Sequence, residues 1–256
     1  MIFDTHAHYD DPVYDKDRET LFQTMRSEGV GIITDIGADI ESTKRAVELS
    51  ESYDFIYAAA GVHPSEVYSL EETDMDFLRE AAKNSKVVAI GEIGLDYHYE
   101  DTVREVQKKW FVRQLEIARE TNLPVVIHSR DAAQDTLDIM KAEHAEEIGG
   151  VIHCFSYGWD MAKIYLDMGF YLGIGGVVTF KNAKKLKEVV QKAPLERLVL
   201  ETDAPYLAPE PYRGKRNASH YLKYVINEIA VLRNLIPEEV ILITEDNGRQ
   251  MYRIAY

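Results

Sequence analysis

Four histidines and two carboxylates lie at the ends of short apolar runs that are spread along the whole chain. These six residues are His6, His8, Glu92, His128, His153 and Asp203. Imidazole nitrogens and carboxylate oxygens are common ligands of divalent metal ions in hydrolytic enzymes. The set therefore predicts a metal-dependent hydrolase rather than a binding module.

The His-x-His pair near the N-terminus is the simplest part of this set. His6 and His8 fall in a predicted strand, and side chains at i and i+2 of a strand share one face. Both imidazoles can therefore reach one cation, with nitrogens about 2.1 Å from it. A lone pair of this kind is also compatible with two half-exposed histidines. Five of the eight histidines lie at or just past predicted strand ends. Chance alone would rarely place so many histidines at such positions, which favours a metal site.

Two carboxylates are the candidate catalytic residues. Glu92 lies between Gly91 and Gly94, directly after the apolar run 87–90, and is expected to face the interior or mouth of a barrel. A carboxylate there is unfavourable unless it is paired or binds metal. Asp203 is expected nearest the mouth, as a ligand and as the general base. Glu201, one layer deeper, is expected to orient a histidine ligand.

Short apolar runs alternate with amphipathic stretches throughout. We predict strands near residues 2–6, 31–36, 55–60, 87–91, 124–128, 150–153, 170–174 and 197–202. We predict helices near 15–28, 40–51, 71–84, 102–121, 131–143, 159–168, 181–191, 217–234 and 237–247. This alternation predicts an α/β fold, a TIM-type (β/α)8 barrel, in which residues 1–256 form a single domain. Such a barrel gathers its strand ends at one mouth, where distant residues can meet.

Composition narrows the setting of this hydrolase. The net charge of −15 argues against a generally basic nucleic-acid-binding surface, although a local basic patch and bound cations could neutralise phosphates. The single cysteine, Cys154, fits a reducing cytoplasm, and strand alternation is expected to point it away from the mouth. Neither a signal peptide nor a membrane span is evident, so we expect a cytoplasmic protein. We also expect a monomer or weak oligomer.

Six motifs follow one another in the order DTHAH (4–8), GVHP (61–64), GEIGLDY (91–97), HSR (128–130), HCFS (153–156) and ETDAPY (201–206). In order and spacing, over nearly the full chain, they closely resemble the TatD family of metal-dependent deoxyribonucleases. The resemblance implies an amidohydrolase-type barrel with ligands at the six positions named first, and DNA as the substrate, digested from single-stranded ends. One departure follows Asn217, where Ala218 and Ser219 replace the glutamate and proline that the family often has.

We expect two divalent cations bridged by Glu92. His6, His8 and Asp203 would hold one, and His128 and His153 the other. Such a pair lowers the pKa of a bound water and stabilises both oxygens of a displacement at phosphorus. Imidazole-rich ligation favours zinc, manganese, iron or nickel, whereas the resemblance points to magnesium or manganese. The choice among magnesium, manganese and zinc stays open.

Four residues are candidate substrate contacts, each with an alternative. His63 could donate a hydrogen bond to a phosphate oxygen or cap its own loop. Arg130 could clamp a phosphate with its planar guanidinium or pair with Asp131. Arg213 begins a basic run that could contact phosphates or form a solvated face. Tyr206 could stack on a base or belong to the local core. Outside these four, the same two alternatives apply to Phe155.

Two other functions compete with a deoxyribonuclease. The first is a small-molecule amidohydrolase or esterase that uses the same binuclear centre. Some amidohydrolases bridge their metals with a carboxylated lysine on strand four or five, and neither predicted strand contains a lysine. The second is a non-catalytic scaffold with a vestigial site. The complete ligand set disfavours it, because unpaired buried histidines and carboxylates destabilise a protein.

Overall fold

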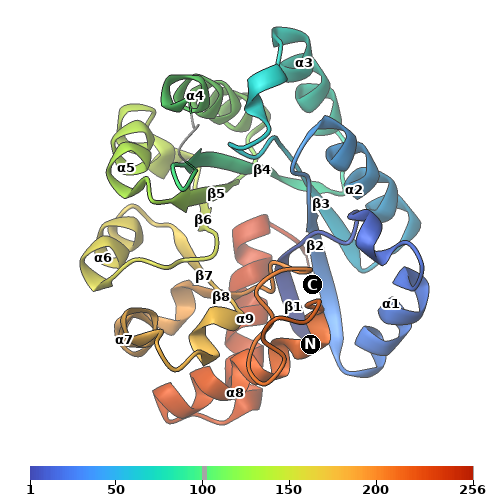
Figure 1. Cartoon of the computed structure of the whole chain (residues 1–256), viewed down its shortest axis with the longest axis vertical. Helices are drawn as coiled ribbons and strands as arrows, with labels where there is room; N and C mark the ends of the chain where they lie inside the picture. The colour runs from blue at the N-terminus through green and yellow to red at the C-terminus, as the bar shows by residue number, and fades with distance from the viewer. Residues whose placement is uncertain (100–102, 256) are drawn as a thin grey trace.

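The computed structural model describes residues 1–99 and 103–255 of the chain. Within them, eight parallel strands form one sheet in the order β1 to β8 (Figure 1). The strands are β1 (Ile2–Ala7), β2 (Val30–Ile36), β3 (Ile56–Ala60), β4 (Val87–Asp96), β5 (Val125–Arg130), β6 (Gly150–Ile152), β7 (Tyr171–Ile174) and β8 (Leu198–Leu200). The predicted (β/α)8 barrel is confirmed.

The barrel closes where β1 meets the segment that follows β8. The backbone N–H groups of Thr202 and Asp203 donate to the carbonyl of His6 over 3.3 and 3.0 Å, and the N–H of His8 donates to the Ala204 carbonyl over 2.8 Å. The buried Asp4 carboxylate accepts from the Thr202 hydroxyl over 2.6 Å. This closure brings the His6–His8 segment directly beside Asp203.

The helices surround the strands (Figure 1). In the described part of the chain they are α1 (Arg18–Ser27), α2 (Ile40–Ser52), α3 (Glu72–Ala81), α4 (Arg104–Thr121), α5 (Ala133–Ala142), α6 (Trp159–Asp167), α7 (Lys184–Lys192), α8 (Leu222–Arg233) and α9 (Pro237–Tyr252). Their apolar faces pack on the outer faces of the strands, so most strand positions are buried on both sides, as parallel sheets require. Among the described residues, no helix is long and apolar enough to cross a membrane.

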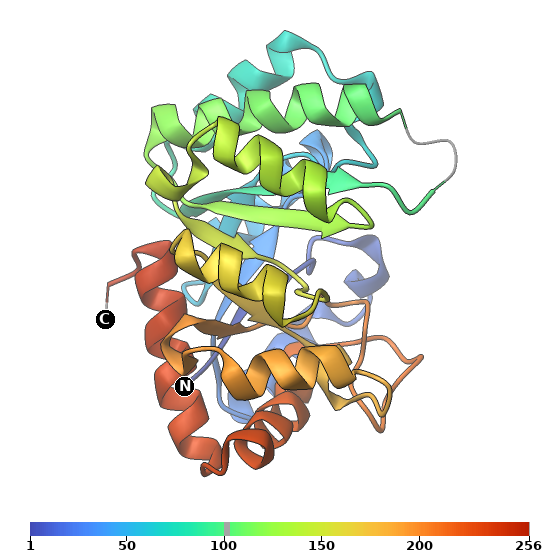
Figure 2. The same cartoon turned by 90° about the vertical axis from the view of Figure 1, so that its left-hand side faces the viewer.

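Helix α9 covers the end of the barrel at which the strands begin (Figure 2). The Tyr252 ring packs 6.0 Å from the ring of Phe3, and its hydroxyl donates to the Thr5 carbonyl over 2.8 Å. Gly248 permits this contact, because a Cβ at this position would lie 2.7 Å from Cδ1 of Phe3. With this end filled by side chains, access to the barrel is from the opposite end.

Two elements extend by about five residues beyond their predicted ends. Strand β4 continues to Asp96, so Glu92 lies within the strand and not after it. The strand persists because Gly94 and Asp96 pair with His128 and Arg130 of β5. Helix α9 continues past the predicted end at residue 247, because Gly248 packs against the barrel and does not terminate the helix.

Candidate metal centre

The first two imidazoles face each other at the end of β1. His6 is 1% exposed and His8 is 8% exposed, and their Nε2 atoms are 3.2 Å apart. Nδ1 of His8 lies 2.8 Å from the Ile36 carbonyl, which can only accept, so in the neutral ring Nδ1 carries the proton and Nε2 has the lone pair. This arrangement brings the Nε2 atoms of both rings to a common point, where they could bind one cation.

Glu92 lies at the middle of the cluster, and its two oxygens face different histidines. Oε2 is 3.4 Å from Nε2 of His6 and 3.9 Å from Nε2 of His8. Oε1 is 2.7 Å from Nδ1 of His128 and 3.5 Å from Nε2 of His153. The side chain is nearly fully buried. One carboxylate thus joins two pairs of imidazoles, which is the geometry that a bridging ligand requires.

His153 is held by a carboxylate beneath it. Its Nδ1 lies 3.2 Å from Oε2 of Glu201, and Oε1 of Glu201 accepts the Cys154 N–H over 2.6 Å. Gly173 of β7 makes room for this carboxylate, because a Cβ there would lie 2.2 Å from Oε2 of Glu201. The orienting contact predicted for Glu201 is present, and it leaves Nε2 of His153 directed at Glu92.

His128 has a second carboxylate partner that the sequence reasoning missed. Its Nε2 lies 3.1 Å from Oδ2 of Asp96, on the side opposite Glu92. Asp96 also accepts the N–H of His98 over 2.9 Å. The available signal was alternation along β4, since Glu92 and Asp96 are four residues apart and share a strand face. The prediction ended that strand too early to use it.

Asp203 completes the cluster from the segment after β8. Its Oδ1 lies 3.5 Å from Nε2 of His8, 3.8 Å from Nε2 of His6 and 3.9 Å from Nε2 of His153. Its backbone is left-handed, with φ of 57°. At 17% exposure, its side chain is more accessible than that of Glu92, at 4%. All six predicted ligands therefore converge at the carboxyl end of the barrel.

Burial and neighbouring charges set the ionisation of these groups. Burial opposes ionisation of Glu92, but the charges of His153 and His6 hold its pKa well below the usual range. Burial opposes protonation of His153, but Glu201 and Glu92 raise its pKa to about 10. Burial likewise opposes protonation of His8, but Asp203 raises its pKa to about 9. The ionised carboxylates of the cluster thus need nearby positive charge to stabilise them, and either protonated histidines or a bound cation can supply it.

His63 caps its own loop, which is one of the two roles considered for it. Its Nδ1 accepts the N–H of Ser65 over 3.1 Å, so it caps its own loop. This contact leaves the proton of the neutral ring on Nε2, which lies 4.0 Å from Oε1 of Glu92. Burial and the charge of His128 lower the pKa of His63 to about 3. A neutral imidazole with its N–H directed into the mouth can donate to an anionic oxygen.

The donor set fits divalent cations. His6, His8 and Asp203 have ligand atoms within 4.8 Å of one another, and so do His63, Glu92 and His128. Facing imidazole nitrogens and two buried carboxylates are an unfavourable arrangement without positive charge. Nitrogen and carboxylate oxygen donors suit zinc and manganese, and the carboxylates also suit magnesium.

Cys154 does not point away from the mouth as strand alternation predicted. Its Sγ lies within 4.8 Å of a ring nitrogen of His153 and a carboxylate oxygen of Asp203. Alternation fails because β6 ends at Ile152 and Cys154 adopts a left-handed backbone with φ of 45°. Burial raises the pKa of its thiol well above the usual range, so at neutral pH it is a protonated thiol.

The predicted substrate contacts lie around the rim. Arg130 is exposed, and its guanidinium lies 5.9 Å from the centroid of the Tyr99 ring. Its proposed alternative partner, Asp131, instead pairs with His98 over 3.0 Å. Tyr206 is 56% exposed, with its ring 6.4 Å from that of His8.

Arg213 and Phe155 are the two remaining residues that were considered as substrate contacts. The Arg213 guanidinium is exposed and lies 4.4 Å from the centroid of the Phe180 ring, outside the cluster of histidines. Phe155 is only 2% exposed and packs against Tyr157 and Tyr165. The stacking prediction for Phe155 was therefore wrong, because its ring belongs to the core.

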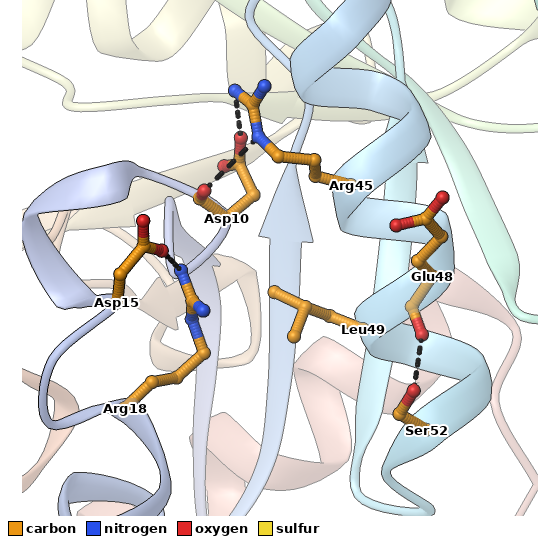
Figure 3. Close-up of a pocket in the computed structure, with 7 residues that line it drawn as sticks. All are labelled: Asp10, Asp15, Arg18, Arg45, Glu48, Leu49 and Ser52. Atoms are coloured by element: carbon orange, nitrogen blue, oxygen red, sulfur yellow. Dashed lines mark hydrogen bonds and ion pairs between the residues drawn. The ribbon is translucent and has the colours of Figure 1, made fainter.

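A pocket of about 230 Å³ lies beside the loop that follows His8. Figure 3 shows Arg45 facing Asp10, and Arg18 facing Asp15. The Arg45–Asp10 pair is 3.2 Å long, the Arg18–Asp15 pair is 2.7 Å long, and Arg18 also donates to the Tyr9 carbonyl over 2.7 Å. These contacts fix the loop next to the cluster and occupy both guanidinium groups.

Comparison with known proteins adds family information. The model of a family described as TatD related DNase matches residues 3–253. The Bacillus subtilis protein YabD, an uncharacterized metal-dependent hydrolase, is 46% identical over 254 residues that cover 99% of this chain and 100% of YabD. The Escherichia coli protein YcfH, described in the same words, is 36% identical over 257 residues, with 99% and 96% of the two chains covered.

A solved structure agrees with the fold. The crystal structure of YjjV, a TatD homolog from Escherichia coli, superposes with a TM-score of 0.94 at 31% identity and covers 99% of this chain and 98% of that chain. The phosphotriesterase homology protein of Escherichia coli, with phosphate in its active site, shares the fold with a TM-score of 0.67 at 14% identity over 98% of both chains.

Proposed function

The chain belongs to the TatD-related DNase family of metal-dependent hydrolases, and from this premise we propose that it is a deoxyribonuclease that hydrolyses phosphodiester bonds of DNA. The family description and the cluster of imidazoles and carboxylates support this proposal. The reaction would remove nucleotides from single-stranded ends, with water as the nucleophile.

One observation carries the proposal of two ions. The Oε2 atom of Glu92 faces His6 and His8, whereas its Oε1 atom faces His128 and His153. We assign His6, His8 and Asp203 to one divalent ion and His128 and His153 to the other, with Glu92 shared. Magnesium, manganese or zinc, when bound, would acidify a water and stabilise the charge that develops on phosphate oxygens.

The chain's own residues would orient the substrate and move protons. Asp203 is the general base in this proposal. Its carboxylate is more exposed than that of Glu92 and can therefore exchange a proton with solvent. His63 would donate a hydrogen bond from its neutral Nε2–H group to a phosphate oxygen. Glu201 and Asp96 would hold His153 and His128 in fixed orientations.

The rim residues would bind DNA around the scissile bond. Arg130 can offer a planar pair of donors to a phosphate. Tyr206 is exposed beside His8 and can stack on a base. Arg213 would contact a phosphate further along the strand. We further propose that the protein acts in the cytoplasm, as a monomer or weak oligomer.

A small-molecule amidohydrolase or esterase remains the alternative function. The same centre could activate water for attack on a carbonyl. The strands β4 and β5 contain no lysine, so a carboxylated-lysine bridge of the kind some amidohydrolases use has no residue there. Glu92 occupies the position between the two sets of histidines. The presence of a glutamate there, where some amidohydrolases have a carboxylated lysine, favours the phosphodiesterase over the amidohydrolase.

The test compares Asp203→Asn with a matched control, Asp131→Asn, whose carboxylate is exposed and pairs only with His98 among the described residues. Each protein is loaded with manganese, magnesium or zinc and given an end-labelled single-stranded oligonucleotide. We expect the wild type and the control to shorten it, and Asp203→Asn to lose activity by more than about 100-fold. Absence of phosphodiester cleavage by the metal-loaded wild type, with cleavage of amides or carboxyl esters instead, would contradict the proposal.

A further inference from the structure

A row of cations lies on the rim of a strongly acidic protein. Segments 176–187 and 204–216 contain seven of the 29 lysines and arginines but one of the 44 acidic residues, Glu210. Five of these cations are exposed and form no ion pair with any residue in the described part of the chain. We call them the cationic ridge: Lys181, Lys184, Lys185, Arg213 and Lys215.

The two segments of the ridge are packed together. The Arg213 guanidinium lies 4.4 Å from the centroid of the Phe180 ring, and Lys181 is the next residue along the chain. The N–H of Glu210 donates to the Thr179 hydroxyl over 2.9 Å. Figure 2 shows both segments projecting on the side where the strands end. The two segments that carry the five charges therefore lie together on the mouth side of the barrel.

Among residues 1–99 and 103–255, no carboxylate forms an ion pair with these five cations. The first turn of α7 contains Lys184 and Lys185 and no acidic residue, although the N-terminal end of a helix favours negative charge. Further along the same helix, Lys187 pairs with Glu228 over 2.7 Å and Lys192 pairs with Glu188 over 2.5 Å. Within α7, the lysines without an ion-pair partner among the described residues are therefore confined to the end that faces the mouth. An external anion would relieve their repulsion.

The ridge is continuous with the candidate metal centre. The segment after β8 carries Asp203 at the centre, Tyr206 beside His8, and Arg213 over Phe180. The backbone of this segment touches the segment after β7, because a Cβ on Gly176 would lie 2.1 Å from the Leu207 carbonyl oxygen. A chain of phosphates that enters the centre can therefore continue over the ridge.

We propose that the cationic ridge binds the phosphodiester backbone of a nucleic-acid strand, beyond the nucleotide whose bond lies at the metal centre. This inference rests on the proposed function for its choice of polyanion. The ridge binds by charge and reads no bases, since lysines contact phosphates without sequence information. Its lysines attract a strand that the net charge of −15 would otherwise repel.

The test uses the variant K181Q/K184Q/K185Q, which leaves Arg213 and all candidate ligands in place. Its control is K83Q/K109Q/K141Q, which removes three exposed lysines near or on α3, α4 and α5 and changes the net charge equally. The readout is kcat/KM for a 20-nucleotide single strand divided by kcat/KM for bis(p-nitrophenyl) phosphate. We expect this ratio to fall about tenfold in the ridge variant and to keep the wild-type value in the control.

Salt dependence and direct binding separate the ridge from the proposed activity. The slope of log affinity for the oligonucleotide against log salt should become shallower by about 2, or about 0.7 for each phosphate that the variant no longer neutralises. Fluorescence anisotropy with metal-free protein measures this binding even if no bond is cleaved. Equal oligonucleotide binding by the wild type and the ridge variant would overturn the inference. So would a ridge variant that fails to bind anionic lipid vesicles but binds the oligonucleotide normally, since the ridge would then serve a membrane.

Discussion

The mouth of the barrel has two parts that are built differently. In the cluster around Glu92, most side chains are buried and several are held by other protein groups, as Glu201 holds His153. On the cationic ridge, side chains such as Lys184 are exposed and lack partners among the described residues. The first arrangement suits reacting atoms, which tolerate little displacement. The second suits a long, variable polyanion, for which charge matters more than position.

Apart from removal of a candidate ligand itself, removing an orienting contact should have the largest effect, because it disturbs the fixed part. We expect Glu201→Gln to weaken metal binding or activity about 10- to 100-fold, since His153 loses its charged acceptor. Gly173→Ala displaces the same carboxylate without removing it, because its Cβ would lie 2.2 Å from Oε2 of Glu201. Metal titration and steady-state kinetics measure both variants. Wild-type behaviour in Glu201→Gln would mean that this fixed contact is dispensable.

A second prediction concerns acid stability. The pKa of His63 is about 3 in the folded protein because burial and His128 oppose protonation, whereas the unfolded chain takes up a proton near pH 6.5. Between these values the unfolded state binds more protons, so stability is lost as the pH falls. From pH 7 to pH 5 this site should destabilise the metal-free protein by about 2 kcal/mol.

Urea unfolding at the two pH values measures this effect. His63→Asn should lose less stability on acidification than the wild type, by the same about 2 kcal/mol. His144→Asn is the control, because the His144 side chain is 67% exposed and is therefore not buried as His63 is. An identical pH dependence in the wild type and His63→Asn would show that His63 is not held neutral.

The smallest effect is expected at the rim. Arg130 is exposed and would form a single phosphate contact, so Arg130→Gln should raise KM for a phosphodiester about fivefold with little change in kcat. Arg253→Gln is the control, since Arg253 donates to the Asn122 carbonyl at the other end of the barrel. A large fall in kcat with unchanged KM would place Arg130 with the fixed part of the mouth.

The difference between the two parts also explains what the sequence could reveal. His6 and His8 were predictable because alternation places residues i and i+2 on one face, and Asp203 was predictable because the ends of parallel strands meet at one mouth. Asp96 was missed because β4 continues beyond its apolar run. Cys154 was misplaced because a left-handed residue interrupts alternation. The packing of Arg213 on Phe180 joins two loops, and no periodic pattern encodes such a contact.

The central claim is that Glu92 joins two divalent ions at the centre of the mouth. Anomalous diffraction from manganese-loaded crystals, measured at the manganese edge, tests it most directly. We predict two peaks about 3.5–4 Å apart, one on each side of the Glu92 carboxylate, and loss of at least one peak in Glu92→Gln. Peaks distant from Glu92, or none at saturating manganese, would contradict the account.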